Sequence, residues 1–171
     1  MTGAIHVCPL SRLDETLQIS GAQTLVTLMK ADSGFERPSG IKPHRHLWLT
    51  MSDISAPLDG HLTPAEEHIR MLIDFVRVWD RSAPLVIHCY AGVSRSAAAA
   101  FAIMCALAPD RSESQLAQSM RELSPTATPN PLIVSLADAY LARQGRMVEA
   151  VLSIGRGVDC FEGVPFRFDL D

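Results

Sequence analysis

The sequence is poor in aromatic residues and has no cluster of basic ones. Only 6% of its 171 residues are aromatic, and this favours helices packed on a small sheet over a β-sandwich. The net charge is −4 and the Lys and Arg residues are scattered, so we expect no nucleic-acid partner. Because the length suits one hydrophobic core, we predict a single α/β domain over residues 1–171.

Cysteines are also few and far apart, with no CxxC pair: Cys8, Cys89, Cys105 and Cys160. This spacing is typical of reduced intracellular thiols rather than of disulfides or a zinc site. No secretion signal is visible at the amino terminus, and the longest apolar stretch, residues 97–109, is shorter than the ~20 residues that span a bilayer. We expect a cytoplasmic protein with no membrane partner, metal or cofactor, and we assume a monomer.

Short apolar or β-branched runs predict strands at residues 4–7, 24–29, 47–51 and 85–87. A short helix or turn is expected at residues 10–17, and helices at 63–81, 96–107, 113–123, 132–144 and 147–154. The helix over 63–81 is the clearest, with Thr63 as its cap and Pro64 at its first position. Residues 155–171 are expected to be irregular. The pattern indicates a small, mostly parallel central sheet of about four or five strands flanked by helices.

The segment HCYAGVSRS, from His88 to Ser96, follows a predicted buried strand and precedes an Ala-rich helix. It matches the pattern HCxxGxxR[ST], and a chance match in this chain is on the order of 10⁻⁴. A short loop between a strand and a helix N-terminus aims backbone N–H groups at an anion, and the helix dipole adds to the attraction. Gly92 permits a positive φ or a close backbone approach. Arg95 offers a planar fork for two phosphate oxygens.

This segment resembles the CX5R loop of cysteine-based protein tyrosine phosphatases, in the form found in dual-specificity phosphatases. The resemblance covers residues 4–144 and is specific only in this loop. It implies phosphomonoester hydrolysis through a phosphocysteine intermediate on Cys89, whose thiolate form the helix dipole and Arg95 would favour. It further implies that His88 orients the loop and that Ser96 donates a hydrogen bond to the sulfur. The phosphate would be bound by the loop residues Tyr90, Ala91, Gly92, Val93, Ser94 and Arg95.

An aryl phosphate expels a phenolate, so a carboxylic acid that donates a proton should add about 10²–10⁴ in rate. The resemblance implies an aspartate on a mobile loop upstream of the cysteine. Asp53 and Asp59 qualify, 36 and 30 residues before Cys89. We prefer Asp53 because it directly follows the predicted strand at residues 47–51, whereas Asp59-Gly60 is a common turn dipeptide. A simple turn or cap is the alternative for Asp53.

The segment PTATPNPL, residues 125–132, resembles the stretch before the penultimate helix of dual-specificity phosphatases. Asn130 is expected either to buttress the anion loop or to act as a plain N-cap. His44 and His46 form a His-x-His pair, but no carboxylate or cysteine completes a metal site around them. Whether Cys8 or Cys160 lies near enough to Cys89 for redox regulation stays open.

Three functions are compatible with this loop. The first is a phosphatase whose partner is a protein or peptide phosphorylated on tyrosine, with serine and threonine left open. A rhodanese-like sulfurtransferase also holds its cysteine between a strand and a helix, but Gly92 and Arg95-Ser96 fit phosphate better. A catalytically silent phosphate-binding module is disfavoured because Cys89 and Arg95 are both present. Residues 90, 91, 93 and 94 include no Lys or Arg, and this weighs against lipid phosphates.

Overall fold

A computed structural model describes residues 3–170, which contain one sheet of five strands in the order β3-β2-β4-β1-β5. The strands are β1 Ala4–Pro9, β2 Thr24–Met29, β3 His46–Thr50, β4 Leu85–Cys89 and β5 Phe166–Asp169. β1 to β4 are parallel to their neighbours, whereas β5 runs antiparallel beside β1. The predicted α/β class with a small, mostly parallel sheet is confirmed.

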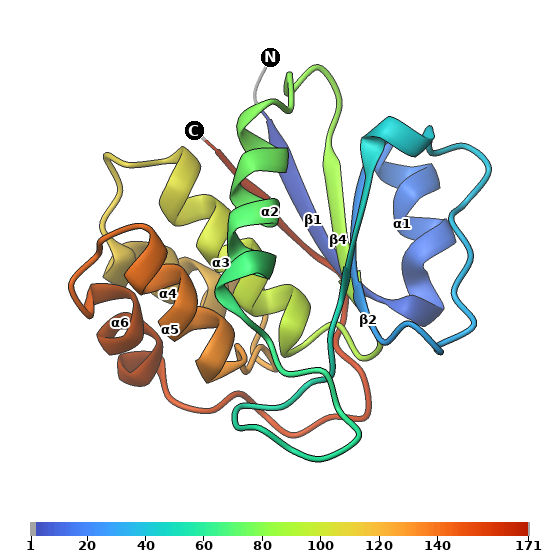
Figure 1. The fold of residues 1–171 in the computed structure, drawn as a ribbon. Coiled ribbons are helices and arrows are strands. Elements are labelled where there is room, and N and C mark those ends of the chain that lie inside the picture. Colours follow the sequence, from blue (N-terminus) through green and yellow to red (C-terminus); the bar gives the residue numbers. More distant parts are fainter. Residues whose placement is uncertain (1–2, 171) are drawn as a thin grey trace.

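The described residues form six α-helices, and α1 lies alone on one face of the sheet while α2 to α6 gather on the other (Figure 1). The helices are α1 Leu13–Ser20, α2 Glu66–Arg77, α3 Arg95–Leu107, α4 Glu113–Leu123, α5 Pro131–Tyr140 and α6 Arg146–Ile154. Two 3-10 turns, Leu10–Arg12 and Pro43–Arg45, accompany them. Every side chain of α3 from Arg95 to Cys105 is buried, because its alanines allow the sheet and the outer helices to approach closely. Within residues 3–170, no helix combines the length and the apolar composition needed to cross a membrane.

The helix predicted over residues 63–81 is shorter than expected. It begins at Glu66, two residues after Pro64, and its N-cap is Ala65 rather than Thr63. The imidazole Nδ1 of His68 accepts a hydrogen bond from the Ala65 N–H at 3.0 Å. A histidine inside the first turn therefore satisfies the backbone donor at this end, and the prediction of Thr63 as the cap is wrong.

The C-terminal third also departs from the predicted pattern. α5 ends at Tyr140 rather than at residue 144, because residues 142 and 144 adopt positive φ angles of 52° and 57°. β5 lies in the segment expected to be irregular. Phe166 and Phe168 of this strand are buried, while Arg167 and Asp169 are exposed. This alternation is the pattern of a strand with one face on the core, but it is only four residues long.

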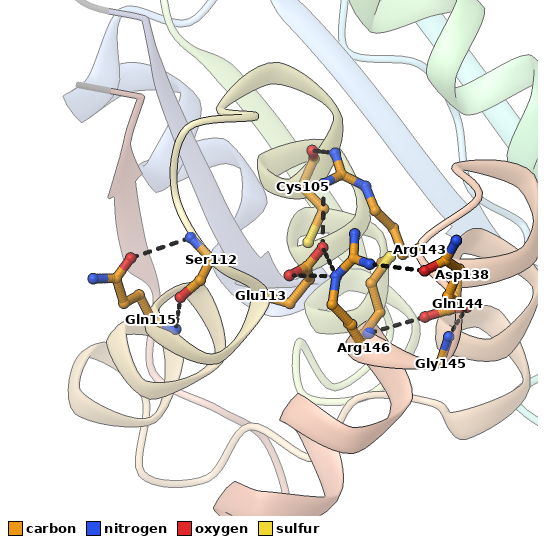
Figure 2. A network of polar contacts seen from close by, with 10 residues as sticks. Cys105, Ser112, Glu113, Gln115, Asp138, Arg143, Gln144, Gly145 and Arg146 are labelled. Atoms are coloured by element: carbon orange, nitrogen blue, oxygen red, sulfur yellow. Dashed lines mark hydrogen bonds and ion pairs between the residues drawn. The ribbon is translucent and has the colours of Figure 1, made fainter.

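A polar network joins α3, α4, α5 and α6 (Figure 2). Glu113, only 6% exposed, accepts hydrogen bonds from Arg143 Nη1 at 3.1 Å and from Arg146 Nε at 3.3 Å. Arg143 also donates to the carbonyl of Cys105, and Asp138 accepts two backbone N–H groups around the start of α6. Every charge in this group has a partner, so the network stabilises the packing of α3, α4, α5 and α6 against one another.

Candidate active site

The carboxyl ends of β1 to β4 meet at one edge of the sheet, the lower edge in Figure 1. At this edge β4 ends at Cys89 and α3 begins at Arg95. We call residues 89–95 the anion loop. In open α/β sheets, ligands bind outside the carboxyl ends of the strands, and the cysteine motif therefore lies where this topology places a binding site.

Four carbonyl groups of the anion loop are bound by backbone N–H groups from distant parts of the chain. The carbonyls of Tyr90 and Ala91 accept from the N–H groups of Leu10 (3.1 Å) and Gly163 (2.8 Å), respectively. The carbonyls of Val93 and Ser94 accept from the N–H groups of Thr128 (2.8 Å) and Asn130 (3.2 Å). A trans peptide places its N–H opposite its carbonyl. The N–H groups of residues 91, 92, 94 and 95 consequently face the inside of the loop. Convergent backbone N–H groups of this kind make a cradle for an anion.

Gly92 meets two constraints that no other residue would satisfy. Its φ is 72°, in the left-handed region that favours glycine. A Cβ at this position would lie 2.5 Å from the backbone nitrogen of Pro9 and 2.7 Å from the carbonyl carbon of Cys8. The sequence offered a positive φ or a close approach as alternatives, and the position requires both.

The sulfur of Cys89 lies at the base of the loop and the residue is only 2% exposed. The Gly92 N–H donates to Sγ at 3.3 Å, and Ser96 Oγ lies 3.1 Å from the same sulfur. A thiolate has no proton to give, so the Ser96 hydroxyl donates whenever the sulfur is ionised. Both contacts, together with the N-terminus of α3, stabilise negative charge on Cys89.

The guanidinium of Arg95 is buried without a carboxylate. Arg95 is 7% exposed, and its Nη1 donates to the carbonyl of Met51 at 3.0 Å. Its Nε has no acceptor among residues 3–170, and no acidic side chain of that part of the chain lies within ion-pair distance. A buried cation is costly unless an anion compensates it. Arg95 is therefore disposed to bind an anionic ligand.

Asp53 lies against the anion loop, three residues beyond the end of β3. Its Oδ1 accepts hydrogen bonds from Ser94 Oγ at 2.7 Å and from Asn130 Nδ2 at 2.9 Å. Asn130 Nδ2 also donates to the carbonyl of Ile54 at 3.1 Å, while its Oδ1 accepts the N–H groups of residues 132 and 133 at the start of α5. Asn130 therefore combines the two roles that the sequence left as alternatives: it caps α5 and it supports the loop.

Asp59 is placed differently. It is exposed and belongs to a turn in which the His61 N–H donates to the carbonyl of Leu58 at 3.1 Å. Gly60 in this turn has a φ of 78°, as the Asp-Gly dipeptide suggested. Among the described residues, no hydrogen bond joins the Asp59 carboxylate to the anion loop. Of the two candidate aspartates, Asp53 is the one that contacts the anion loop.

His88 is fully buried and its Nε2 lies 2.9 Å from Thr27 Oγ1, on the neighbouring strand β2. The same hydroxyl lies 2.9 Å from Nε2 of His46. Burial lowers the pKa of His88 to about 4, although the backbone of Cys89 opposes this shift, and burial also lowers the pKa of His46. Both imidazoles are thus neutral near pH 7. Sequence reasoning missed Thr27 entirely and considered His46 only as a metal ligand.

Two hollows flank the anion loop. One of about 250 Å³ is lined by Met29, Lys30, Ser33, Tyr90 and Arg95. The other, of about 500 Å³, lies between residues 53–58 on one side and Ser94, Asn130 and Pro131 on the other. The candidate acid and the candidate phosphate clamp therefore each line a space that a substrate can enter.

The other three cysteines differ from Cys89 in their surroundings, and all four are free thiols. Cys8 packs in the small cluster beneath α1, whereas Cys89 belongs to the main core under α2 to α6. Burial raises the pKa of both Cys8 and Cys105 to about 12, so these thiols stay protonated. Cys160 is exposed. Within residues 3–170, no group of three or more His, Cys, Asp or Glu side chains is arranged to hold a metal ion.

Comparison by sequence finds no matching family profile and no matching curated protein. Comparison by structure finds clear similarity to solved phosphatases. The chain is similar to PTP-2 phosphatase of Cydia pomonella (18% identity, covering 79% of this chain and 84% of that one, TM-score 0.62). It is similar to human DUSP28 (22%, 82% and 90%, TM-score 0.62) and to PTPMT1 in complex with PI(5)P (13%, 86% and 88%, TM-score 0.57). The chain therefore has the fold of dual-specificity and related cysteine-based protein tyrosine phosphatases.

Proposed function

We propose that this chain is a phosphomonoester hydrolase that removes phosphate from phosphotyrosine in proteins, with Cys89 as a covalent nucleophile. One feature carries the proposal: the outward-bound carbonyls leave four N–H groups facing into the loop that starts at Cys89, and the guanidinium of Arg95 in the same loop is buried without a carboxylate. A phosphoryl group has several anionic oxygens, which would satisfy these donors and the charge together.

In the first step the Cys89 thiolate attacks phosphorus, and a sulfur–phosphorus bond forms as the phosphorus–oxygen bond to the leaving group breaks. The leaving oxygen takes a proton from Asp53. Because Asp53 Oδ1 already accepts two hydrogen bonds, its proton is carried on Oδ2. The cradle and Arg95 hold the equatorial oxygens throughout, so the charge that develops in the transition state meets preorganised donors.

In the second step a water molecule attacks phosphorus and gives its proton to the Asp53 carboxylate. The sulfur–phosphorus bond breaks, inorganic phosphate forms, and the sulfur leaves as a thiolate. The Ser96 hydroxyl, 3.1 Å from Sγ, donates to the departing sulfur and lowers the barrier to its release. Cys89 is then ready for another cycle.

His88 acts on this chemistry from behind the loop. Its hydrogen bond with Thr27 holds the backbone of β4 at the point where Cys89 begins the loop. The imidazole is neutral there, because burial disfavours its charged form. We therefore assign His88 a positioning role.

The hollow beside Arg95 supports an aryl phosphate as substrate. Its lining residues include Tyr90 and Met29, and aromatic and apolar residues suit an aromatic ring leading to the phosphate. Lys30 is the one basic side chain besides Arg95 in this hollow. Lipid phosphates such as the PI(5)P bound to PTPMT1 carry more charge than one lysine compensates, so we favour phosphotyrosine over a phosphoinositide.

The proposal is tested by assaying purified protein with para-nitrophenyl phosphate and stopping the reaction in acid. We expect turnover, and we expect mass spectrometry to find the added phosphoryl group on the peptide that contains Cys89. Cys89→Ser should abolish both signals, while Cys105→Ser, a substitution far from the loop, should retain them. A panel of phosphotyrosine, phosphoserine and phosphothreonine peptides, with a phosphoinositide, then ranks the substrates.

Two results would contradict the proposal. Turnover of thiosulfate without turnover of aryl phosphate would indicate a rhodanese-like sulfurtransferase. A folded wild-type protein that binds phosphopeptides tightly but hydrolyses none would indicate a silent phosphate-binding module.

A further inference from the structure

We infer that the C-terminal segment, residues 155–165, is a positioning element of the anion loop, and that Gly163 is the residue through which it acts. This segment passes beneath the carboxyl edge of the sheet between α6 and β5 (Figure 1). The expected effect on catalysis rests on the proposed function. The expected effect on anion binding does not, because binding can be measured without turnover.

A chain of two hydrogen bonds joins Gly163 to the sulfur. The Gly163 N–H donates to the carbonyl of Ala91 at 2.8 Å. The Ala91 carbonyl and the Gly92 N–H belong to one peptide group, and this N–H donates to Cys89 Sγ at 3.3 Å. A bond to the carbonyl polarises the peptide and strengthens the donor at its other end. Gly163 thus both fixes the orientation of the 91–92 peptide and strengthens its contact with the sulfur.

The approach of the segment requires glycine at position 163. A Cβ there would lie 2.9 Å from Val93 Cγ1, 3.3 Å from the carbonyl oxygen of Gly92 and 3.4 Å from Thr126 Oγ1. The φ of Gly163 is not in the left-handed region, so alanine is permitted by the backbone itself. Its cost arises from contact with the loop, where the Val93 side chain and the Gly92 carbonyl must give way to accommodate it.

The segment is anchored on both sides of Gly163. Upstream, Arg121 Nη2 donates to the carbonyl of Gly155 at 2.8 Å, and the Val158 N–H donates to the carbonyl of Pro125 at 2.9 Å. Downstream, the buried phenylalanines of β5 hold the chain against β1. With both sides fixed, an added methyl group at Gly163 cannot be relieved by moving the segment away.

Burial of its own side chains does not explain why the segment lies here. Val158, Phe161 and Val164 are 66%, 86% and 73% exposed. The contacts that the segment makes are instead mostly those of its backbone, with the anion loop and with residues 125–128. These backbone contacts, rather than burial of its side chains in the core, therefore hold the segment in place.

The test measures binding of tungstate and inorganic phosphate by titration calorimetry in Gly163→Ala, with Phe161→Ala as the matched control on the same segment. We expect Gly163→Ala to lower the oxyanion affinity about ten- to a hundredfold, with a similar loss in kcat for an aryl phosphate and little change in thermal midpoint. Phe161→Ala should leave all three unchanged. Shortening the facing side chain in Val93→Ala/Gly163→Ala should recover most of the affinity, judged against Val93→Ala alone.

A second measurement uses the wild-type protein and does not depend on the variant folding. We expect tungstate to slow hydrogen exchange of the Gly163 amide at least tenfold, because the ligand holds the carbonyl that this amide binds, whereas the Phe161 amide should not respond. Unchanged exchange at Gly163, or wild-type oxyanion affinity in Gly163→Ala, would overturn the inference. Failure of the wild-type protein to bind either oxyanion would instead refute the proposed function.

Discussion

One half-buried arginine and one buried arginine lie in this molecule under opposite conditions. Arg143, with 18% of its side chain exposed, pairs with Glu113 in the network of Figure 2. Arg95, 7% exposed, donates to the carbonyl of Met51 and has no carboxylate partner among the described residues. A cation with its anion already present holds helices together. A cation buried without one reduces stability in the free protein and gains its compensation from a ligand.

The largest expected effect comes from removing the unpaired cation. Arg95→Lys keeps the charge but loses the two-pronged fork, and we expect kcat/KM for an aryl phosphate to fall about 10³-fold. In Arg95→Met we expect kcat/KM to fall at least as far. Without ligand, however, this variant should have a free energy of unfolding about 1 kcal/mol higher than that of the wild type. Arg143→Met, the matched control, should leave kcat/KM unchanged and lower the stability. Equal stability losses for the two Met variants would remove the contrast between the arginines.

The second prediction concerns the carboxylate nearest to the loop. Asp53 binds Ser94 and Asn130 rather than Arg95, so Asp53→Asn should act on catalysis and not by unpairing the arginine. We expect kcat for phenyl phosphate to fall about 10²-fold, with a smaller loss for para-nitrophenyl phosphate, whose leaving group needs less protonation. The decline of activity at high pH should disappear, because an asparagine has no acidic proton to donate at any pH. The same defect in Asp59→Asn would reverse the assignment.

The third prediction concerns His88, a buried base that stays neutral instead of carrying an unpaired charge as Arg95 does. Burial holds the folded-state pKa of His88 at about 4, below the unfolded value of about 6.5. The unfolded chain therefore binds the proton more readily, and stability falls as the pH drops from 6.5 towards 4. Between pH 7 and pH 5 the free energy of unfolding of the wild type should fall by about 2 kcal/mol more than that of His88→Asn, as measured by urea unfolding. The exposed His44 provides the control, because His44→Asn should keep the wild-type slope.

The smallest expected effect concerns the paired arginine's own partner. Burial acts to raise the pKa of Glu113, but a backbone N–H, Arg146 and Arg143 outweigh it and hold the pKa below its ordinary value. The resulting stabilisation is fully present above the unfolded pKa of about 4.3 and is lost as pH falls through the folded value. Glu113→Gln should cost about 1 kcal/mol at pH 7 and nothing near pH 2, with activity intact. A loss that persists at pH 2 would show that shape, not charge, holds the network.

Local signals were enough to predict much of this fold. The bounds of β2 and α4 agree with the predicted runs at residues 24–29 and 113–123, because β-branching and helical spacing act within each element. The anion loop was also recognisable, since its cysteine, glycine and arginine lie within seven residues of one another. The catalytic roles given to these residues remain predictions until activity is measured.

Contacts made across the fold were not predictable in the same way. Thr27 faces His88 only because β2 pairs with β4 in a register that aligns these two residues. Gly163 reaches Ala91 only because β5 returns the chain to β1. Neither pairing leaves a periodic signal in its own segment. The residues missed by sequence reasoning are those whose partners are chosen by the sheet topology.

The four outward bonds of the anion loop also have a consequence for folding kinetics. Their donors, at residues 10, 128, 130 and 163, span almost the entire chain, and contacts between such distant residues form slowly because loop closure must come first. The cradle should therefore be assembled late, after α3 and the central strands have condensed. Pulsed hydrogen exchange during refolding should find the amides of α3 protected before those of Ala91 and Gly92. Until that last step Cys89 would be an ordinary thiol on a partly folded chain.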